Sequence, residues 1–254
     1  MANQFTIDRL SVSICHDKHE LGRIAADTAE QCMGKALDER GEAVIVLATG
    51  ASQFEFLDSL NRRRIDWKKV VAFHLDEYVG IDENHPASFR RYLKERIIDK
   101  AGIGTCFLIQ GDARDTDAEC KRLENAFKRY SVDVAFVGIG ENGHLAFNDP
   151  PARFEDPVSF KTVELDPKCR AQQLGEGWFK TLEDVPHHAI TMTIPAIMAS
   201  KTIVCSVPDL RKAEAVKNTL MEKVSPQHPA SILRKHGNAY LFLDPPSASL
   251  LTRL

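Results

Sequence analysis

AVIVLATG, residues 43–50, is a continuous run of apolar residues that ends at a glycine. Such a run is typical of a strand that is buried on both faces, as in a parallel sheet covered by helices. Helical patterns separate most of the similar short runs, which lie at residues 10–15, 70–78, 106–111, 132–138, 201–207 and 238–244. The alternation predicts an α/β fold with a doubly wound, mainly parallel sheet and helices on both faces.

The expected helices fill the gaps between these strands. They lie at residues 17–40, where Asp17 can cap the first turn, and at 53–62, 87–98, 116–130 and 211–223. No repeat or linker divides the chain, so we expect a single Rossmann-like domain over residues 1–254. The rhythm weakens after Pro150, and the polar, glycine-containing stretch KCRAQQLGEGWF (168–179) predicts a lid-like segment at about 158–185.

Composition limits the classes of partner. A net charge of −3 over 254 residues provides no general basic field for nucleic acid or a membrane surface. The six cysteines are scattered without a C-x-x-C pair, which indicates free thiols in a reducing compartment. Neither an apolar signal core at the N-terminus nor a run of about 18 apolar residues is present, so we expect a cytoplasmic protein. His74, Glu77, His85 and the pair His187–His188 match no compact ligand spacing, so no metal is expected.

The segment GIGENG, residues 138–143, is a literal G-x-G-x-x-G. A dinucleotide-binding loop requires a helix directly after the glycines, to hold the pyrophosphate at its N-terminus. Prolines at 150, 151 and 157 disfavour that helix. Two interpretations stay open for the segment by itself: a glycine-rich connection without chemistry, or a functional loop that carries Asn142, His144 and Asp149.

Two other expected strand ends carry polar groups, at the edge where doubly wound sheets bind ligands. Asp76 is either a turn or cap acid, or a carboxylate base whose pKa is tuned by partial burial. Gly50, Ala51 and Ser52 either form an ordinary strand-to-helix turn or present N–H groups and a hydroxyl to a phosphate. Lys212 either is a solvated lysine or adds positive charge to the same anion.

Taken together, these segments resemble the glucosamine-6-phosphate deaminase/isomerase family. FHLDEYVGIDENHPASFRRYL (73–93) is similar to the D-E-Y-V-G segment of that family, including the His-Pro and Ser that follow it. GIGENGHLAFNDP (138–150) resembles the family's G-x-G-x-x-G-H-x-A-F-N-[E/D]-P loop, and VLATGAS (46–52) resembles its phosphate-binding turn. The resemblance implies conversion of glucosamine 6-phosphate to fructose 6-phosphate and ammonia, without a redox cofactor or a metal.

The resemblance also implies residue roles. Asp76 corresponds to the base that abstracts the proton from C2, and His144 to the group that opens the pyranose ring. Asn142 and Asp149 stand at the positions that orient this histidine, where the family usually has Asp and Glu. An amide cannot stabilise an imidazolium by charge, and Asp is one methylene shorter than Glu. Both departures bear on ring opening and on the identity of the sugar.

For the phosphate, the resemblance implies Gly50, Ala51 and Ser52, with Lys212 as the counter-charge and Arg170 as an arginine fork from the lid-like segment. Three alternatives remain open beside a glucosamine-6-phosphate deaminase. They are a 6-phosphogluconolactonase-like hydrolase, a deaminase for another amino-sugar phosphate, and a non-catalytic sugar-phosphate sensor. Retention of both Asp76 and His144 favours an enzyme, since binding alone requires no base. The sequence leaves the oligomeric state undecided.

Overall fold

An eight-stranded sheet forms the centre of the computed structural model, which describes residues 3–251. Its strands lie in the order β1-β2-β11-β10-β7-β3-β4-β6, and all neighbours are parallel except β1 and β2. The bounds are β1 Asn3–Ile7, β2 Leu10–Ile14, β3 Ala43–Leu47, β4 Val70–His74, β6 Thr105–Phe107, β7 Val134–Val137, β10 Thr202–Val207 and β11 Ala239–Leu243. The predicted mainly parallel α/β sheet is therefore confirmed.

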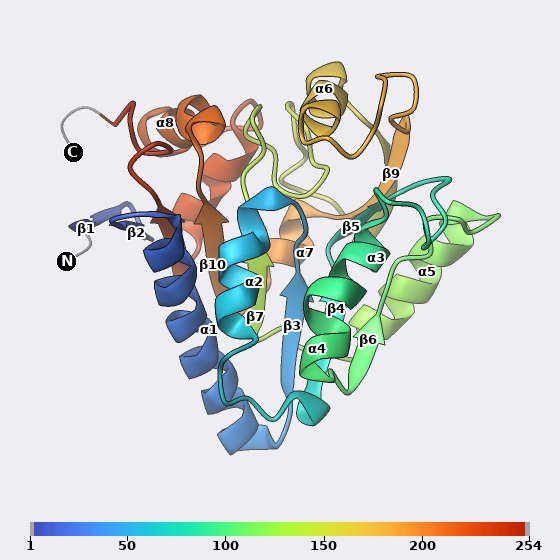
Figure 1. Cartoon of the computed structure of the whole chain (residues 1–254), viewed down its shortest axis with the longest axis horizontal. Coiled ribbons are helices and arrows are strands. Elements are labelled where there is room, and N and C mark those ends of the chain that lie inside the picture. Colours follow the sequence, from blue (N-terminus) through green and yellow to red (C-terminus); the bar gives the residue numbers. More distant parts are fainter. Residues whose placement is uncertain (1–2, 252–254) are drawn as a thin grey trace.

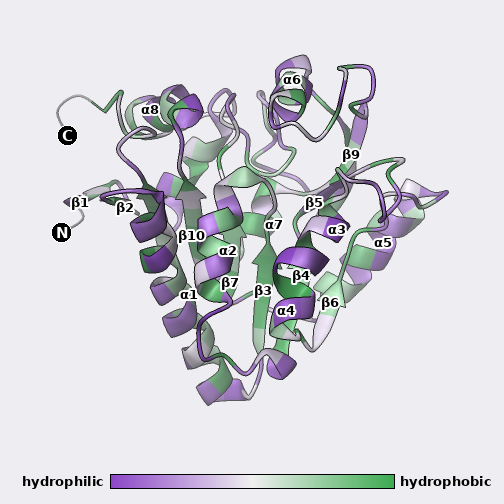
Figure 2. Cartoon of the chain, viewed as in Figure 1, coloured by the Kyte–Doolittle hydropathy of each residue, from purple (hydrophilic) through white to green (hydrophobic). Residues whose placement is uncertain are grey.

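Helices cover both faces of this sheet (Figure 1). One face packs against α1 (Lys18–Arg40), α2 (Phe54–Leu60) and α3 (Phe89–Leu93). The other packs against α5 (Thr116–Phe127), α7 (Ile194–Met198) and α8 (Ala213–Met221). Strand β3 explains the continuous apolar run, because Ala43, Ile45 and Leu47 belong to one core and Val44 and Val46 to the other. Figure 2 shows the same arrangement, with apolar strands inside and hydrophilic outward surfaces on α1.

The first helix begins and packs as its sequence predicts. The Asp17 carboxylate accepts hydrogen bonds from the N–H groups of His19 and Glu20, both at 2.8 Å. A Cβ at Gly22 would lie 2.5 Å from the carbonyl of Glu55, so the glycine permits close contact between α1 and α2. This contact fixes the position of α2, which continues from the turn that follows β3.

The predicted single strand at 70–78 is wrong, because the chain changes sheets at Leu75. Strand β4 ends at His74, and β5 (Asp76–Tyr78) joins a second, three-stranded sheet of order β5-β9-β8. Its partners are β9 (His188–Met192) and β8 (Phe160–Glu164), both in antiparallel pairing. The Leu75 N–H donates to Leu47 of the main sheet at 3.1 Å, while its carbonyl accepts from Met192 of the second at 2.8 Å.

Several shorter elements differ from the expected helices. The predicted helix at 87–98 is α3, followed by a π-helical turn at Lys94–Ile98 and α4 (Asp99–Ala101). The sequence did not predict β1 or the 3₁₀ helix at Pro229–Lys235. Further 3₁₀ turns lie at Ala51–Gln53, Trp67–Lys69 and Leu210–Lys212.

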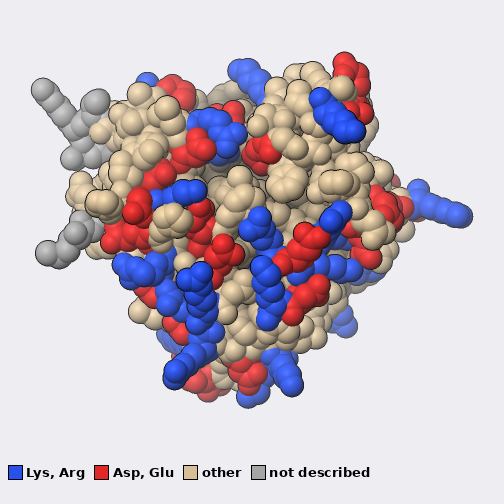
Figure 3. Space-filling model, in the orientation of Figure 1, with Lys and Arg blue, Asp and Glu red and all other residues tan. Residues whose placement is uncertain are grey.

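The segment 158–185 contains β8 and helix α6 (Pro167–Gly175), which lies above the carboxyl ends of the main strands (Figure 1). Its movement as a lid stays a prediction, as does the assignment of residues 1–254 to one domain. Within residues 3–251, no helix is long and apolar enough to cross a membrane. Figure 3 shows acidic and basic side chains interleaved on the face it presents, in agreement with the small net charge.

Candidate active site

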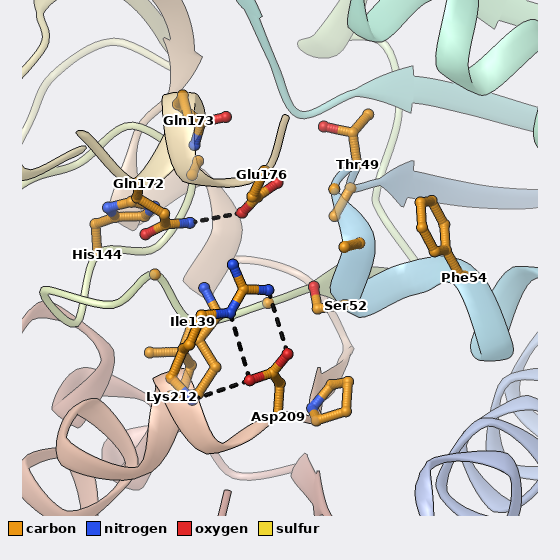
Figure 4. Close-up of a pocket in the computed structure, with 18 of the residues that line it drawn as sticks. Thr49, Ser52, Phe54, Ile139, His144, Gln172, Gln173, Glu176, Asp209 and Lys212 are labelled. Carbon is orange, nitrogen blue, oxygen red and sulfur yellow. Dashed lines mark hydrogen bonds and ion pairs between the residues drawn. The ribbon is translucent and has the colours of Figure 1, made fainter. Parts of the chain in front are cut away.

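A cavity of about 600 Å³ lies between the carboxyl ends of the main strands and helix α6. This is the edge at which doubly wound sheets bind ligands. Figure 4 shows side chains that reach it from opposite sides. The main strand ends contribute Thr49–Ser52 after β3, Leu75 and Asp76 after β4, Gly138–Gly140 and His144 after β7, and Pro208–Lys212 after β10.

Asp76 presents a desolvated carboxylate to this cavity. The residue is 7% exposed, and no group within residues 3–251 donates a hydrogen bond to its side chain. Burial, followed by the neighbouring negative charge of Glu77, raises the pKa of Asp76 to about 8. A carboxylate of this kind is a stronger base than one in water and is available to a ligand in the cavity.

Glu77 is bound on the opposite face of β5, because side chains alternate along a strand. Its carboxylate is fully buried and accepts hydrogen bonds from the N–H groups of Tyr78, Phe89 and Arg90, at 3.0, 3.1 and 2.8 Å. The Ser88 hydroxyl donates a further bond at 3.1 Å. These bonds join β5 to the beginning of α3. Of the two neighbouring carboxylates, Asp76 and Glu77, only Asp76 faces the cavity.

His144 contacts Asp149 at the rim of the same cavity. The imidazole Nδ1 lies 3.0 Å from a carboxylate oxygen of Asp149, which also accepts from the Asn142 amide at 2.9 Å. The second Asp149 oxygen accepts from the Asp166 N–H at 3.1 Å. Burial alone would raise the pKa of Asp149, but His144, Asn142 and the Asp166 N–H outweigh it and hold that pKa below its ordinary value. The carboxylate therefore stays charged beside the imidazole, and Nε2 is left for a ligand.

The glycines of the loop after β7 shape the position of His144. A Cβ at Gly140 would lie 2.2 Å from both Cε1 and Nε2 of the imidazole, so the ring packs directly against this glycine. Gly143 has φ of +87°, a conformation that other residues rarely adopt. No helix lies within residues 138–159, as the prolines predict. The structure therefore excludes the helix that a dinucleotide-binding loop requires, and it assigns the loop to the cavity.

The turn after β3 lies on another wall of the cavity. Gly50 has φ of +93° and precedes the 3₁₀ turn Ala51–Gln53, and Ser52 faces the cavity (Figure 4). The Tyr92 hydroxyl donates to the Gly50 carbonyl at 2.9 Å. Gln53, which the sequence did not single out, is 1% exposed and donates to the Ser52 hydroxyl at 3.1 Å and the Val137 carbonyl at 3.4 Å. It connects the turn after β3 to β7.

Two cationic side chains reach the cavity from the segment after β10, Arg211 and Lys212. Lys212 is 6% exposed, burial lowers its pKa, and it takes part in none of the ion pairs formed within residues 3–251. Arg211 was not predicted from the sequence, and it pairs with Asp209 at 3.2 Å. Both residues follow the strand end, which is the one sequence signal that could have included Arg211.

Arg170 is a correction to the predicted site, because it does not line the cavity. Its guanidinium donates to the backbone carbonyls of Leu182 at 2.6 Å and Val185 at 2.9 Å. It therefore holds the loop after α6. A different face of α6 points towards the cavity, and the sequence could not show how this face is oriented.

That inner face of α6 carries Gln172, Gln173 and Glu176 (Figure 4). The Gln172 side chain accepts from the Glu141 N–H at 2.8 Å and donates to Glu176 at 3.0 Å. The Tyr78 hydroxyl donates to the side-chain amide oxygen of Gln173 at 2.5 Å. Helix α6 is thus bound to the loop after β7 and to β5, the two segments that carry His144 and Asp76.

Comparisons with known proteins agree with this geometry. The family model described as glucosamine-6-phosphate isomerases/6-phosphogluconolactonase matches residues 16–241. Among curated relatives, the glucosamine-6-phosphate deaminase of Listeria monocytogenes serotype 4a is 37% identical over 205 residues, 81% of this chain and 86% of the relative. That of Lactobacillus delbrueckii subsp. bulgaricus is 32% identical over 242 residues, 95% of this chain and 100% of the relative.

Solved structures of similar proteins also match this chain. A monomeric glucosamine-6-phosphate deaminase superposes with a TM-score of 0.85 at 31% identity, covering 94% of this chain and 99% of its own. A 6-phosphogluconolactonase from Trypanosoma brucei superposes with a TM-score of 0.76 at 16% identity, covering 98% and 100%. The second likeness concerns the fold alone.

Proposed function

The chain belongs to the glucosamine-6-phosphate isomerase/6-phosphogluconolactonase family, and we propose that within this family it is a glucosamine-6-phosphate deaminase. The reaction converts glucosamine 6-phosphate and water to fructose 6-phosphate and ammonia. One observation carries the proposal: the buried Asp76 carboxylate, which has no hydrogen-bond donor among residues 3–251, shares a cavity with the carboxylate-paired His144. Lactone hydrolysis breaks no C–H bond and has no use for the first of these groups.

The first step is the opening of the pyranose ring, in which a proton leaves the O1 hydroxyl and one is delivered to O5. His144 is suited to this transfer, because a neutral imidazole accepts and returns protons near neutral pH. The charged carboxylate of Asp149 stabilises the imidazolium that forms in between. Asn142 contributes orientation, since its side-chain amide donates to Asp149 at 2.9 Å and its side-chain oxygen accepts from the backbone N–H of His144 at 3.1 Å.

The second step is the enolisation of the open-chain sugar. Asp76 abstracts the proton from C2, the freed electron pair forms the C1–C2 double bond, and the aldehyde oxygen takes a proton from water, which gives an enolamine. Return of a proton to C1 converts the enolamine to the imine at C2. Water then adds to the imine and ammonia leaves. The raised pKa of Asp76, about 8, matches the group to proton transfer on carbon near neutral pH.

The phosphate is proposed to bind at the turn of Gly50, Ala51 and Ser52. N–H groups of a turn with a positive-φ glycine form a concave anion site, and the Ser52 hydroxyl adds a donor. Lys212 supports the assignment as a buried cation without an ion-pair partner within residues 3–251. Arg211 takes the role first expected of Arg170, because it lines the cavity and Arg170 does not.

The partner is thus a small-molecule sugar phosphate. We propose further that the protein acts in the cytoplasm and does not bind nucleic acid, which the free cysteines and the net charge of −3 support. The route uses protein side chains and water, with no redox step. The gluco or galacto configuration of the sugar and the oligomeric state are not assigned.

The test is ammonia release from glucosamine 6-phosphate by wild type, Asp76→Asn and His144→Gln, with galactosamine 6-phosphate and 6-phosphogluconolactone as competing substrates. We expect release by wild type and a loss of at least about 10²-fold in each variant, the usual size of a general acid–base contribution. Substrate binding by Asp76→Asn, measured calorimetrically, shows that the site is intact. Lactone hydrolysis without ammonia release, or release that Asp76→Asn leaves unchanged, would contradict the proposal.

A further inference from the structure

A second group of chemically reactive side chains lies behind the imidazole of His144. A ring nitrogen of His144, a carboxylate oxygen of Asp149 and the Cys169 thiol all lie within 4.8 Å of one another, and Nδ1 is the nitrogen 3.0 Å from Asp149. His144 and Asp149 come from the loop after β7, whereas Cys169 lies in the first turn of α6. The route proposed for deamination uses the first two and leaves the thiol without a role.

The histidine nitrogen in this group lacks a proper hydrogen bond. The His144 side chain is 9% exposed, and Nδ1 is among the buried side-chain nitrogens without a hydrogen-bond partner, although Asp149 lies 3.0 Å away. That Asp149 oxygen already accepts from Asn142. A buried nitrogen therefore faces a carboxylate and a thiol without a bond that satisfies it, an arrangement that a cation with directed coordination would complete.

We propose that His144, Asp149 and Cys169 bind Zn²⁺ and that zinc inhibits the enzyme. Imidazole, carboxylate and thiolate are the three ligand types that zinc takes in proteins. Tetrahedral bonds of about 2.0–2.3 Å place ligand atoms roughly 3.3–3.7 Å apart, so a pair at the 4.8 Å limit closes by about 1 Å, whereas the His144–Asp149 pair at 3.0 Å opens slightly. One carboxylate and one thiolate neutralise the charge of the ion, which a buried site requires.

A route to the site is present on the side away from the substrate. A second cavity, of about 430 Å³, is lined by Asp149, Glu164, Asp166 and Pro167 among others. His144 lines the first cavity and Asp149 the second, so this pair lies between the two cavities, with the buried Cys169 thiol beside it. The second cavity can supply the water that completes a four-coordinate ion, and its carboxylates attract cations towards it.

Zinc at this position would stop the chemistry in a defined way. A metal on Nδ1 opposes protonation at Nε2, so the imidazole could not carry the proton of ring opening. The same ion would couple Cys169 of α6 to the loop after β7. This inhibition rests on the proposed function, whereas zinc binding itself does not.

The experiment pairs an activity measurement with a spectroscopic one. Wild type, Cys169→Ala and the control Cys32→Ala, a half-buried cysteine on α1, are titrated with zinc chloride, and ammonia release is measured after an acid quench. Loss of one ligand is expected to raise the half-inhibitory zinc concentration by at least about 10–100-fold, since even outer-shell changes cost that much. Cys32→Ala should match wild type, and EDTA should restore activity.

Binding is measured separately with Co²⁺ in place of zinc. We expect a thiolate-to-cobalt charge-transfer band in wild type and Cys32→Ala, absent in Cys169→Ala and displaced by zinc. The proposal is overturned if no such band forms, or if zinc inhibits Cys169→Ala at the wild-type concentration. Should wild type release no ammonia, the cobalt band still decides the site, and the failure belongs to the proposed function.

Discussion

Replacing Gly140 by alanine tests the geometry of the active site with a single methyl group. The added Cβ would lie 2.2 Å from Cε1 and Nε2 of His144 and 2.4 Å from Cδ2. Ordinary contact begins at about 3.4 Å, so the ring or the loop must move by more than about 1 Å. The ring is the neighbour that moves, and it is the group proposed to open the sugar.

The expected effect follows from that displacement. A misplacement of about 1 Å costs about 10²-fold in rate, or about 2.7 kcal/mol of transition-state stabilisation. We therefore expect kcat of Gly140→Ala to fall about 100-fold. KM should change little, because the proposed phosphate site lies on the turn after β3, away from Gly140. Overpacking should also lower the free energy of unfolding by about 1–3 kcal/mol.

The assay is steady-state ammonia release from glucosamine 6-phosphate, accompanied by thermal unfolding. Gly34→Ala is the matched control, because the residue lies within helix α1 and, beyond the adjacent backbone of that helix, no atom of residues 3–251 lies within 4 Å of its added Cβ. It should keep wild-type kcat and gain about 0.5–1 kcal/mol of stability from helix propensity. A folded Gly140→Ala with kcat within about threefold of wild type would refute the link between ring position and catalysis.

Three further predictions follow from the same site. Because Asp76 must be charged to act, kcat/KM should fall as pH drops below about 8, and Glu77→Gln should move this limb of the pH–rate profile to lower pH by removing a neighbouring negative charge. The pKa of Asp76 is higher in the fold than its ordinary value of 3.8, so its contribution to stability is present below about pH 4 and is lost as pH rises to about 8. At pH 8 the free energy of unfolding of Asp76→Asn should therefore exceed that of wild type by up to about 5 kcal/mol, so the variant melts at a higher temperature. At pH 4 the two should melt at the same temperature; equal melting at both pH values would contradict the burial argument. Arg211→Gln should raise KM for glucosamine 6-phosphate about 10–100-fold, as expected for a charge-assisted hydrogen bond, whereas Arg170→Gln should leave KM unchanged and lower the melting temperature; the reverse pattern would return the phosphate to Arg170.

Much of the fold could be predicted from local pattern. The run at 43–50 predicts a strand buried on both faces, and its alternate residues do lie in two separate cores. Asp17 predicts the beginning of α1, where it caps two N–H groups. The transition at Leu75 could not be predicted, because apolar residues continue across it and its two hydrogen-bond partners, Leu47 and Met192, are distant in the chain.

In the candidate site, too, local sequence predicts some residues, and only the fold identifies the others. His144, Asn142 and Asp149 lie within one loop, and the contacts among them follow from a short stretch of chain. Gln53 and Arg211 were missed, since nothing in their neighbourhood distinguishes a buried or cavity-facing polar residue from a solvated one. Arg170 was assigned wrongly for the complementary reason, since the direction of a side chain on α6 depends on how the helix is docked.

The sequence by itself determined the mainly parallel α/β fold, the family and the loop that carries the histidine, because these depend on periodicity and on residues that are neighbours in the chain. Tertiary structure alone decided that Asp76 leaves the main sheet and enters the cavity, that its pKa rises to about 8, and which arginine reaches the site. Those properties arise from burial and from contacts between segments that are far apart in the chain, and desolvation is set by the packed neighbours rather than by the residue itself.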